Sequence, residues 1–228
     1  MKKIADIWHK RGVGDGLMFS SVIKEYYCKE YDMVYLDVPA LNWLNVKLYN
    51  DVNNIVLGKK SPLYTRERSK RIVFKDSVEH TSSWRNLTWN RDLNEETKLY
   101  NEIVDKHGKD YIIIHERQSD NAHRHMHPID RSHFENKDLP VINVDGRHGH
   151  ILDYATIMQK AKEIHVYEGS FMNLADSITD GSVPLYGHLY CKPHYFDPKM
   201  EHYEIIENIK AGKWHKKLVL QYQKDLSI

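Results

Sequence analysis

The hydrophobic and polar positions of the chain alternate between short apolar runs, typical of buried strands, and longer amphipathic stretches, typical of helices. In the first part of the chain the pattern predicts a βαβαβ order, at residues 3–8, 16–30, 33–38, 39–49 and 53–58. A further strand, RIVF at 71–74, follows a polar stretch. Strands that alternate with helices form parallel sheets with right-handed crossovers. We therefore expect an α/β fold.

A second alternation follows a helix predicted at 95–107. Its strands are expected at 111–115, 139–144, 163–168 and 183–187, and its helices at 151–162 and 169–178. The simplest architecture is two domains, at 1–100 and 101–228, each with its own sheet. The segment from about 199 onward has two short helical patterns, which would brace the first domain or form a homodimer contact.

Composition narrows the class of protein. The 33 basic and 32 acidic residues leave a net charge of +1, which gives no electrostatic drive toward nucleic acid. Cys28 and Cys191 lie too far apart for a disulfide framework or a zinc ligand set. The segment MKKIADIWHK lacks the apolar core of a signal peptide, and no run is long enough to span a membrane. We expect a cytoplasmic protein without a transmembrane segment.

The first predicted strand ends in a glycine-rich stretch, RGVGDG, which runs directly into a long helix. Gly12, Gly14 and Gly16 would let the backbone approach a ligand, and the first helical amides are unpaired donors. Leu17 stands where a dinucleotide-binding fingerprint needs its last glycine, and no Gly-Lys-Ser/Thr triplet of a P-loop follows. Asp15 has two interpretations, a helix cap or a chemical group in a ligand site.

Two later strands also end in residues suited to ligand binding. The apolar run YIIIH ends at His115, and Arg117 and Asp120 follow shortly after it. The guanidinium fork of Arg117 suits a phosphate or diphosphate, and Asp120 would orient Arg117 or a ligand hydroxyl. The alternative is a structural Arg–Asp pair in a loop.

The other strand end is VYEGSFMNLADSI, in which a strand, a turn and a helix start follow one another. Gly169 allows a close approach, the amides of 170–173 point at the ligand, and Glu168 would bind a sugar diol. In the alternative interpretation Ser170 only caps a core helix. The apolar residues of that helix that would face the sheet are Phe171, Leu174 and Ile178.

Ligands of open parallel sheets bind beyond the carboxyl ends of the strands, and in a two-domain protein this means a cleft between the domains. All three stretches fall at such strand ends. The sequence therefore predicts a ligand site built from residues 12–16, 115–120 and 168–173.

These residues carry a resemblance to known enzymes. HKRGVGDGLMFSSVIKEYY, with the strands that follow it, resembles the amino-terminal half of heptosyltransferase-like glycosyltransferases of the GT-B fold, and EGSFMNLADSI followed by VPLYG is similar to their donor-binding element. HERQSD at 115–120 is closer to the His-x-Arg-Arg-x-Asp motif of fucosyltransferases that use GDP-fucose, with Gln118 in place of the second arginine. The resemblance implies two small Rossmann-like domains that face each other across a cleft.

The resemblance also implies an activity. It is an inverting, metal-independent transfer of a sugar from a nucleotide-diphosphate donor to a hydroxyl of a glycan or other acceptor, with no further cofactor. Asp15 would be the base and Arg117 would stabilise the leaving diphosphate, with Gly14 and Gly16 on the acceptor side. The residues implied for donor binding are His115, Asp120, Glu168, Gly169, Ser170, Phe171 and Asn173.

Two other functions stay open at this stage. A binding module would hold a nucleotide or sugar without turnover, and such a module has no need of Asp15. A metal-binding protein is the second alternative, because histidines cluster in two stretches, at positions 123, 125 and 127 and at positions 148 and 150.

Overall fold

The structure of the chain is a computed structural model. It describes residues 2–9, 12–72, 87–116, 129, 131–134, 136, 138–144, 150–167, 169–179 and 182–188. The chain divides into two compact units, Met1–Arg91 and Asp92–Ile228. Residue 100, at which we predicted the division, falls within helix α5 (Leu93–His107), which packs against elements of the second unit.

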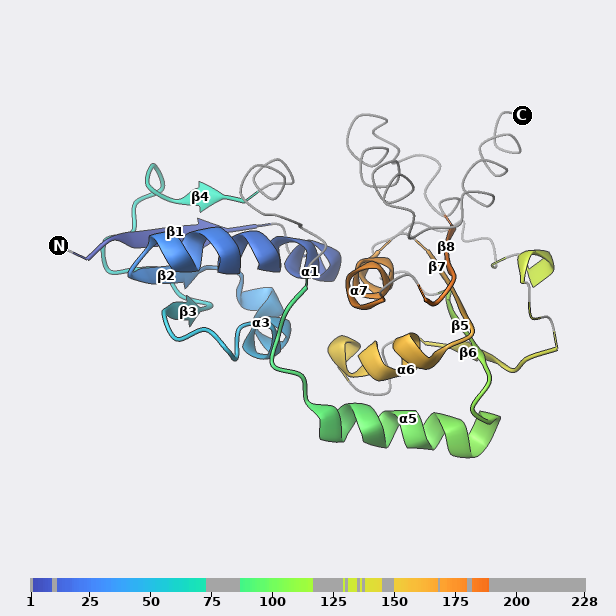
Figure 1. Cartoon of the computed structure of the whole chain (residues 1–228). Coiled ribbons are helices and arrows are strands. Elements are labelled where there is room, and N and C mark those ends of the chain that lie inside the picture. The colour runs from blue at the N-terminus through green and yellow to red at the C-terminus, as the bar shows by residue number, and fades with distance from the viewer. Residues whose placement is uncertain are drawn as a thin grey trace, which may run out of the picture. The chain divides into compact units, whose positions relative to one another are not determined.

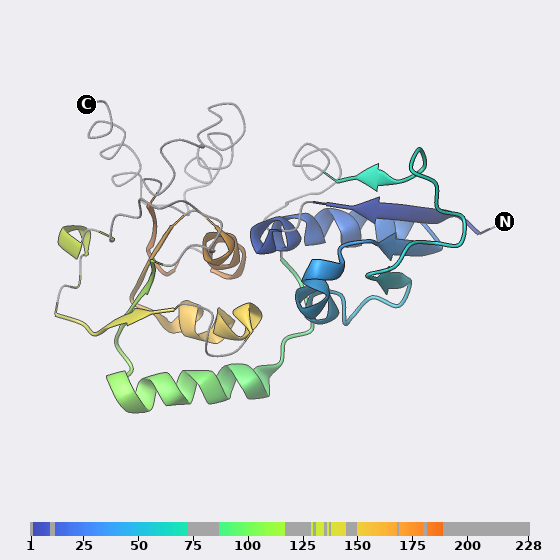
Figure 2. The ribbon, with the colours of Figure 1, turned by 180° about the vertical axis from the view of Figure 1, so that it is seen from behind.

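The first unit contains a four-stranded parallel sheet. Its strands are β1 (Ile4–Trp8), β2 (Met33–Leu36), β3 (Ile55–Leu57) and β4 (Lys70–Arg71), in the spatial order β3-β2-β1-β4. Figure 1 shows helix α1 (Val13–Val22) in front of β1 and β2, and Figure 2 shows it behind them. Buried aliphatic side chains of β1 and β2, such as Ile7 and Val34, form the core beneath this helix.

The helices of the first unit follow the predicted ranges, with one correction. The helix predicted at 16–30 begins at Val13, and it continues through a π-helical turn, η1 (Ile23–Tyr27), into α2 (Cys28–Glu30). The helix predicted from Pro39 consists of a 3₁₀ turn, η2 (Pro39–Leu41), and α3 (Asn42–Leu48). Proline fits the first turn because it has no amide hydrogen to leave unpaired.

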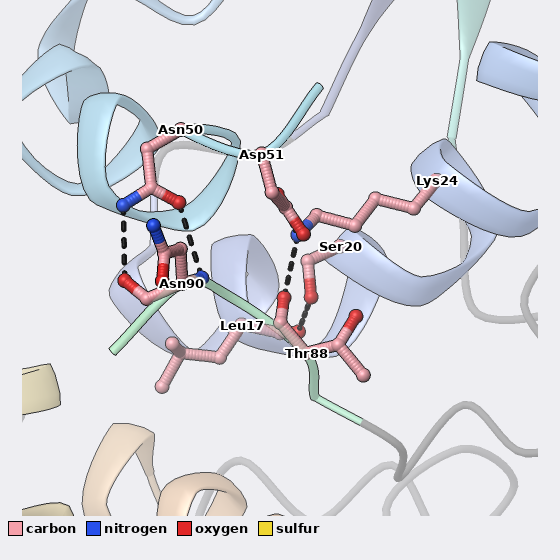
Figure 3. A network of polar contacts seen from close by, with 7 residues as sticks. All are labelled: Leu17, Ser20, Lys24, Asn50, Asp51, Thr88 and Asn90. Carbon is pink, nitrogen blue, oxygen red and sulfur yellow. Dashed lines mark hydrogen bonds and ion pairs between the residues drawn. The ribbon is translucent and has the colours of Figure 1, made fainter.

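A polar network holds the last residues of the first unit in place (Figure 3). The Nζ of Lys24 lies 2.6 Å from Oδ1 of Asp51 and donates to the carbonyl of Thr88 at 2.6 Å. The side-chain amide of Asn50 donates to the carbonyl of Asn90 and accepts from its amide, at 3.0 and 3.1 Å. These bonds tie the segment 87–90 to η1 and to the turn that follows α3.

The second unit contains another four-stranded parallel sheet. Its strands are β5 (Ile112–His115), β6 (Val141–Asn143), β7 (Glu163–Tyr167) and β8 (Leu185–His188), in the order β6-β5-β7-β8. The apolar run of β5 is completely buried, as its pattern predicted. Ile112 and Ile114 pack against Ile129, Phe134 and Tyr167.

The described α-helices of the second unit lie on one side of its sheet (Figures 1 and 2). They are α5, α6 (Ala155–Lys160), which follows the 3₁₀ turn η4 (Ile151–Tyr154), and α7 (Ser170–Ile178). The carboxylate of Asp92 caps α5 by accepting from the amide of Glu95 at 3.3 Å. A further 3₁₀ turn, η3, spans Arg131–His133.

The prediction of an α/β fold with parallel sheets is confirmed, and each predicted strand and helix up to residue 188 has a counterpart. The strand predicted at 71–74 is β4, which spans Lys70–Arg71. The helical patterns predicted from about 199 lie outside the described residues. Among the helices described, none is long and apolar enough to cross a membrane.

Candidate functional site

Each sheet has one point at which its strand order reverses. In the first sheet the chain proceeds from β1 outward to β2 and β3, and β4 then joins the opposite side of β1. In the second sheet β5 is followed by β6 on one side and β7 on the other. Ligands of open α/β sheets bind at the carboxyl ends of the strands that flank such a reversal. The candidate sites are therefore the ends of β1 and β4 and the ends of β5 and β7.

Helix α1 begins next to the end of β1. Gly12 is its N-cap residue, and the amide of Gly16 donates to the carbonyl of Gly12 at 3.0 Å. Asp15 therefore lies within the first helical turn and is not the cap, so the capping interpretation was wrong. Its carboxylate makes no hydrogen bond or ion pair with any described residue, and its side chain is half-buried. It remains available as a base or a ligand-binding group.

The glycines of this stretch have separate structural roles. A Cβ built on Gly12 would lie 3.0 Å from Oδ2 of Asp15, so glycine makes room for that carboxylate. Gly16 is buried, and a Cβ there would lie 2.9 Å from Leu44 of α3. Gly14 is half-buried inside the helix. The expected glycine turn is thus a helical turn, and Gly16 serves close packing between α1 and α3.

Sequence reasoning missed His9 at the same strand end. Its side chain is buried and packs edge-on against Phe19, with ring centroids 5.6 Å apart. It follows β1 directly and lies near Gly16. A histidine directly after a predicted buried strand was the available signal.

In the second unit the structure brings His115 and Phe171 together. His115 is the last residue of β5, and its ring stacks on Phe171 of α7 with centroids 4.3 Å apart. Tyr154 packs edge-on against Phe171, with ring centroids 5.4 Å apart. His115 is 8% exposed and Phe171 is 3% exposed. Both side chains support the start of α7 from within the core.

Glu116 and Asn143, which sequence reasoning missed, connect the ends of β5 and β6. The amide nitrogen of the Asn143 side chain lies 3.4 Å from Oε2 of Glu116, and Oε1 of Glu116 accepts from the amide of Ile129 at 3.0 Å. The residues that flank the segment 117–128 are thereby joined at the carboxyl edge. Arg117 and Asp120 lie outside the described residues.

Helix α7 begins with an unusual glycine. Gly169 is its N-cap residue, with φ +150° and ψ −159°, a backbone conformation that only glycine adopts without strain. Ser170 is the first helical residue and provides no side-chain cap, so the interpretation of Ser170 as a cap was wrong. Within the described chain its hydroxyl makes no hydrogen bond. The amide of Asn173 closes the first helical turn by donating to the carbonyl of Gly169 at 3.1 Å.

This helix start is suited to an anion. The first amides of a helix have no partner inside the helix and lie at the positive end of its dipole. The first turn of α7 contains no acidic residue, and no described side chain caps it. Ser170 is half-buried and adds a hydroxyl donor. Glu168, which precedes this turn, lies outside the described residues.

A buried polar chain runs through the second sheet. Nε2 of His165 lies 3.3 Å from Oε2 of Glu163, and Nδ1 of His165 lies 3.0 Å from Nε2 of His188. The other carboxylate oxygen of Glu163 accepts from the amide of Asn136 at 2.9 Å. Each ring nitrogen of His165 thus has a buried polar neighbour, and the tautomer of the ring sets which of the two donates. The alternation of polar residues in EIHVYE was the signal for this chain.

Of the five histidines considered for a metal site, the structure describes only His150. Nδ1 of His150 accepts from the amide of Leu152 at 3.2 Å, and the amide of His150 donates to Asp153 at 3.1 Å. His150 is therefore the cap of η4. Among the described residues no cluster of three or more metal-ligating side chains occurs. The other histidines of the two stretches lie outside them.

Cys28 is a poor nucleophile. Burial raises the pKa of its thiol from 9.0 to about 11, the nearby Lys24 lowers it by a smaller amount, and Asp51 raises it further. Burial also raises the pKa of the neighbouring Tyr49 hydroxyl, well above 10.0. A thiol is reactive only as thiolate, so Cys28 is protonated and inert near neutral pH.

Comparisons of the chain with known protein families, with curated proteins and with solved structures gave no match.

Proposed function

We propose that this chain is a glycosyltransferase of the GT-B type, which transfers a sugar from a nucleotide-diphosphate donor to a hydroxyl acceptor. The observation that carries the proposal is the start of α7. A glycine-only backbone turn, helical amides without a partner inside the helix, and a serine hydroxyl that bonds to no described residue meet where the strand order of the second sheet reverses. The phosphates of a nucleotide are ligands that match these donors.

The donor site supplies the stabilisation of the leaving group. As the bond between the anomeric carbon and the diphosphate oxygen breaks, its electron pair and negative charge move to the diphosphate. The amides of residues 169–172 and the Ser170 hydroxyl would bind that charge, together with Arg117. The stacked rings of His115 and Phe171 hold the helix start in position.

Asp15 is the proposed base for the acceptor. Its carboxylate takes the proton of the acceptor hydroxyl while the hydroxyl oxygen bonds to the anomeric carbon. Two observations favour this assignment: the carboxylate has no partner among the described residues, and Asp15 lies near the end of β1. Its place in the first turn of α1 also lets the carboxylate stabilise the helix start through the helix dipole.

A thermal-shift panel of ADP, GDP, UDP and CDP, each with its sugars, tests the donor site in the full chain. A nucleotide at about 100 times its dissociation constant stabilises the protein by roughly 2.7 kcal/mol. One nucleotide should raise the melting temperature, and Ser170→Ala should weaken its binding about fivefold through loss of a hydrogen bond.

Ser177→Ala is the matched control, because Ser177 belongs to the same helix and its hydroxyl donates to the carbonyl of Asn173 at 2.7 Å. It should leave the nucleotide affinity unchanged. A panel without any response would contradict the donor site. Binding without product or donor hydrolysis would instead identify a binding module.

A further inference from the structure

The carboxyl ends of β1 and β4 carry an exposed aromatic residue and an exposed guanidinium group. Trp8 and Arg71 are register partners in these adjacent strands, and each is the last residue of its strand. The guanidinium carbon of Arg71 lies 5.3 Å from the centre of the Trp8 ring. Trp8 is 38% exposed. The pair lies where the strand order of the first sheet reverses, which is the ligand-binding position of such a sheet.

Among the described residues, the hydrogen-bonding groups of this pair have no partner. Neither the indole N–H of Trp8 nor the guanidinium group of Arg71 makes a hydrogen bond or an ion pair with any residue that the structure describes. Contact with an aromatic face orients a guanidinium group without using its N–H donors. Arg71 therefore offers a planar set of donors, which matches a phosphate or a carboxylate.

The segment that leads into and includes β4 is strongly cationic, although the chain as a whole is nearly neutral. Between residues 59 and 71 the only acidic residue is Glu67, and the basic residues are Lys59, Lys60, Arg66, Arg68, Lys70 and Arg71. Lys60 lies 3.7 Å from Asp37. The side chains of Lys59, Arg66 and Arg68 form no ion pair within the described ranges. This positive field favours an anionic ligand.

We propose that the ends of β1 and β4 bind an anionic saccharide, a sugar that carries a phosphate or a carboxylate, as the acceptor. The C–H face of the sugar ring packs on the indole of Trp8, and the anionic group accepts hydrogen bonds from Arg71. This inference rests on the proposed function, which assigns the nucleotide to the second unit and leaves the acceptor to the first.

Charged residues also protect an edge strand such as β4 from pairing with another chain. Protection of an edge strand needs only charge. It does not require that the charged residue contact an aromatic ring or stand at the end of the strand. Arg71 contacts the ring of Trp8 and is the last residue of β4. Arg68 belongs to the same cationic segment but precedes β4. Arg68 is therefore the matched control for a site at Arg71.

The test measures binding to the full chain by isothermal titration calorimetry, at low and at high salt. The probes are mannopentaose phosphate, tetragalacturonate, neutral maltotetraose and a short oligothymidylate. At least one charged saccharide should bind about tenfold more tightly than maltotetraose, and salt should weaken its binding. The better charged probe distinguishes a phosphate-bearing from a carboxylate-bearing acceptor.

Variants then locate the site. Arg71→Gln and Trp8→Leu should each weaken binding of the better charged saccharide about tenfold, whereas Trp8→Tyr should retain it because the aromatic face is kept. Arg68→Gln and Trp43→Leu should change it by less than about twofold, since Trp43 is an exposed tryptophan on α3. Circular dichroism checks that each variant is folded.

Several results would overturn the inference. Equal losses in Arg68→Gln and Arg71→Gln, with none in Trp8→Leu, would indicate diffuse charge attraction. Tighter binding of the oligothymidylate would indicate a nucleic-acid surface, and no binding of either charged saccharide would exclude the site. A nucleotide response without saccharide binding overturns this inference alone. Saccharide binding at Trp8 and Arg71 without a nucleotide response overturns the proposed function alone.

Discussion

In each sheet a helix that begins at a glycine follows a strand, but only one of the two helix starts contains a negatively charged residue. The first turn of α1 contains its own carboxylate, Asp15, beside the N-cap Gly12. The first turn of α7 contains no acidic residue. Since a helix start attracts anions, Asp15 meets this preference within α1, whereas the first turn of α7 has no carboxylate of its own to meet it. The comparison teaches that one local pattern, a strand followed by a glycine-led helix, can have a carboxylate at the helix start in one unit and none in the other.

The glycines differ as well. Gly12 and Gly16 are needed for space, because a Cβ at either position would meet Asp15 or Leu44. Gly169 is needed for its backbone conformation, and no described atom lies within 4 Å of a Cβ built there. Space beside a glycine-only backbone is compatible with close approach of a ligand.

The largest expected effect tests the carboxylate of α1. If Asp15 is the base, Asp15→Asn should lower the transfer rate by about 10²–10⁴-fold and leave nucleotide affinity unchanged. Product formation with the donor that the nucleotide panel identifies measures this. Asp51→Asn, which removes a carboxylate that is paired with Lys24, is the control and should leave the rate of the folded protein unchanged. Equal losses in the two variants would remove Asp15 from the mechanism.

The next effect tests the backbone of Gly169. Gly169→Ala should lower the free energy of unfolding by about 1–3 kcal/mol through backbone strain and should also abolish the nucleotide-induced thermal shift. Gly108→Ala is the matched control, because Gly108 has φ +86° and likewise no atom near a built Cβ. It should lose similar stability in urea denaturation but keep the nucleotide response. Loss of the response in both variants would show that it reflects stability alone.

Gly16→Ala tests the contrasting role of a glycine that provides space. The new methyl group would lie 2.9 Å from Cδ2 of Leu44, so overpacking should cost about 1–3 kcal/mol. In a Leu44→Val background, where the shorter side chain gives way, the same change should cost less. Urea denaturation of the four chains measures the coupling. Equal costs in both backgrounds would mean that glycine at 16 is not required by contact with α3.

The smallest expected effect is a loss of folding stability at alkaline pH, caused by ionisation of a buried group in each unit. Burial raises the pKa of Cys28 from 9.0 to about 11 in the folded state. Below pH 9 the thiol is protonated in both the folded and the unfolded chain, so it does not reduce the free energy of unfolding. That free energy falls as the pH rises from 9 toward 11, because the thiol then ionises more readily in the unfolded chain. The loss attributable to Cys28 should be about 1 kcal/mol at pH 10.

Urea denaturation of the full chain between pH 8 and about pH 10.5 measures this loss, with Cys28→Ala expected to show a smaller one. In the second unit burial also raises the pKa of Tyr111, whose hydroxyl donates to the carbonyl of Ile157 at 2.9 Å. An identical pH dependence in Cys28→Ala would mean that the thiol makes no contribution.

Most elements of the fold could be predicted because their signals are local. The apolar run of β5 and the amphipathic pattern of α5 indicate burial without knowledge of their neighbours. The start of α1 was misplaced because three glycines weaken a predicted helix. In the structure Gly16 packs against Leu44 of α3 and Leu41 of η2, and this contact between distant residues outweighs propensity.

The candidate sites were only partly predictable. Strand ends identified Asp15, His115, Gly169 and Ser170, but their pattern did not reveal that His115 and Phe171 stack within the core. Trp8 and Arg71 are 63 positions apart, and only the register of β1 with β4 brings them together. The same holds for Glu163, His165 and His188, which meet through the pairing of β7 with β8.

The sequence by itself determined the alternation of strands and helices, the parallel sheets and the position of glycine-led helices at strand ends, because periodicity and turn chemistry act over a few residues. The tertiary structure decided the strand orders and therefore which strand ends flank a reversal. It also decided which glycine provides space and which provides a special backbone conformation. These properties depend on contacts between residues far apart in the chain, and local patterns do not encode such contacts.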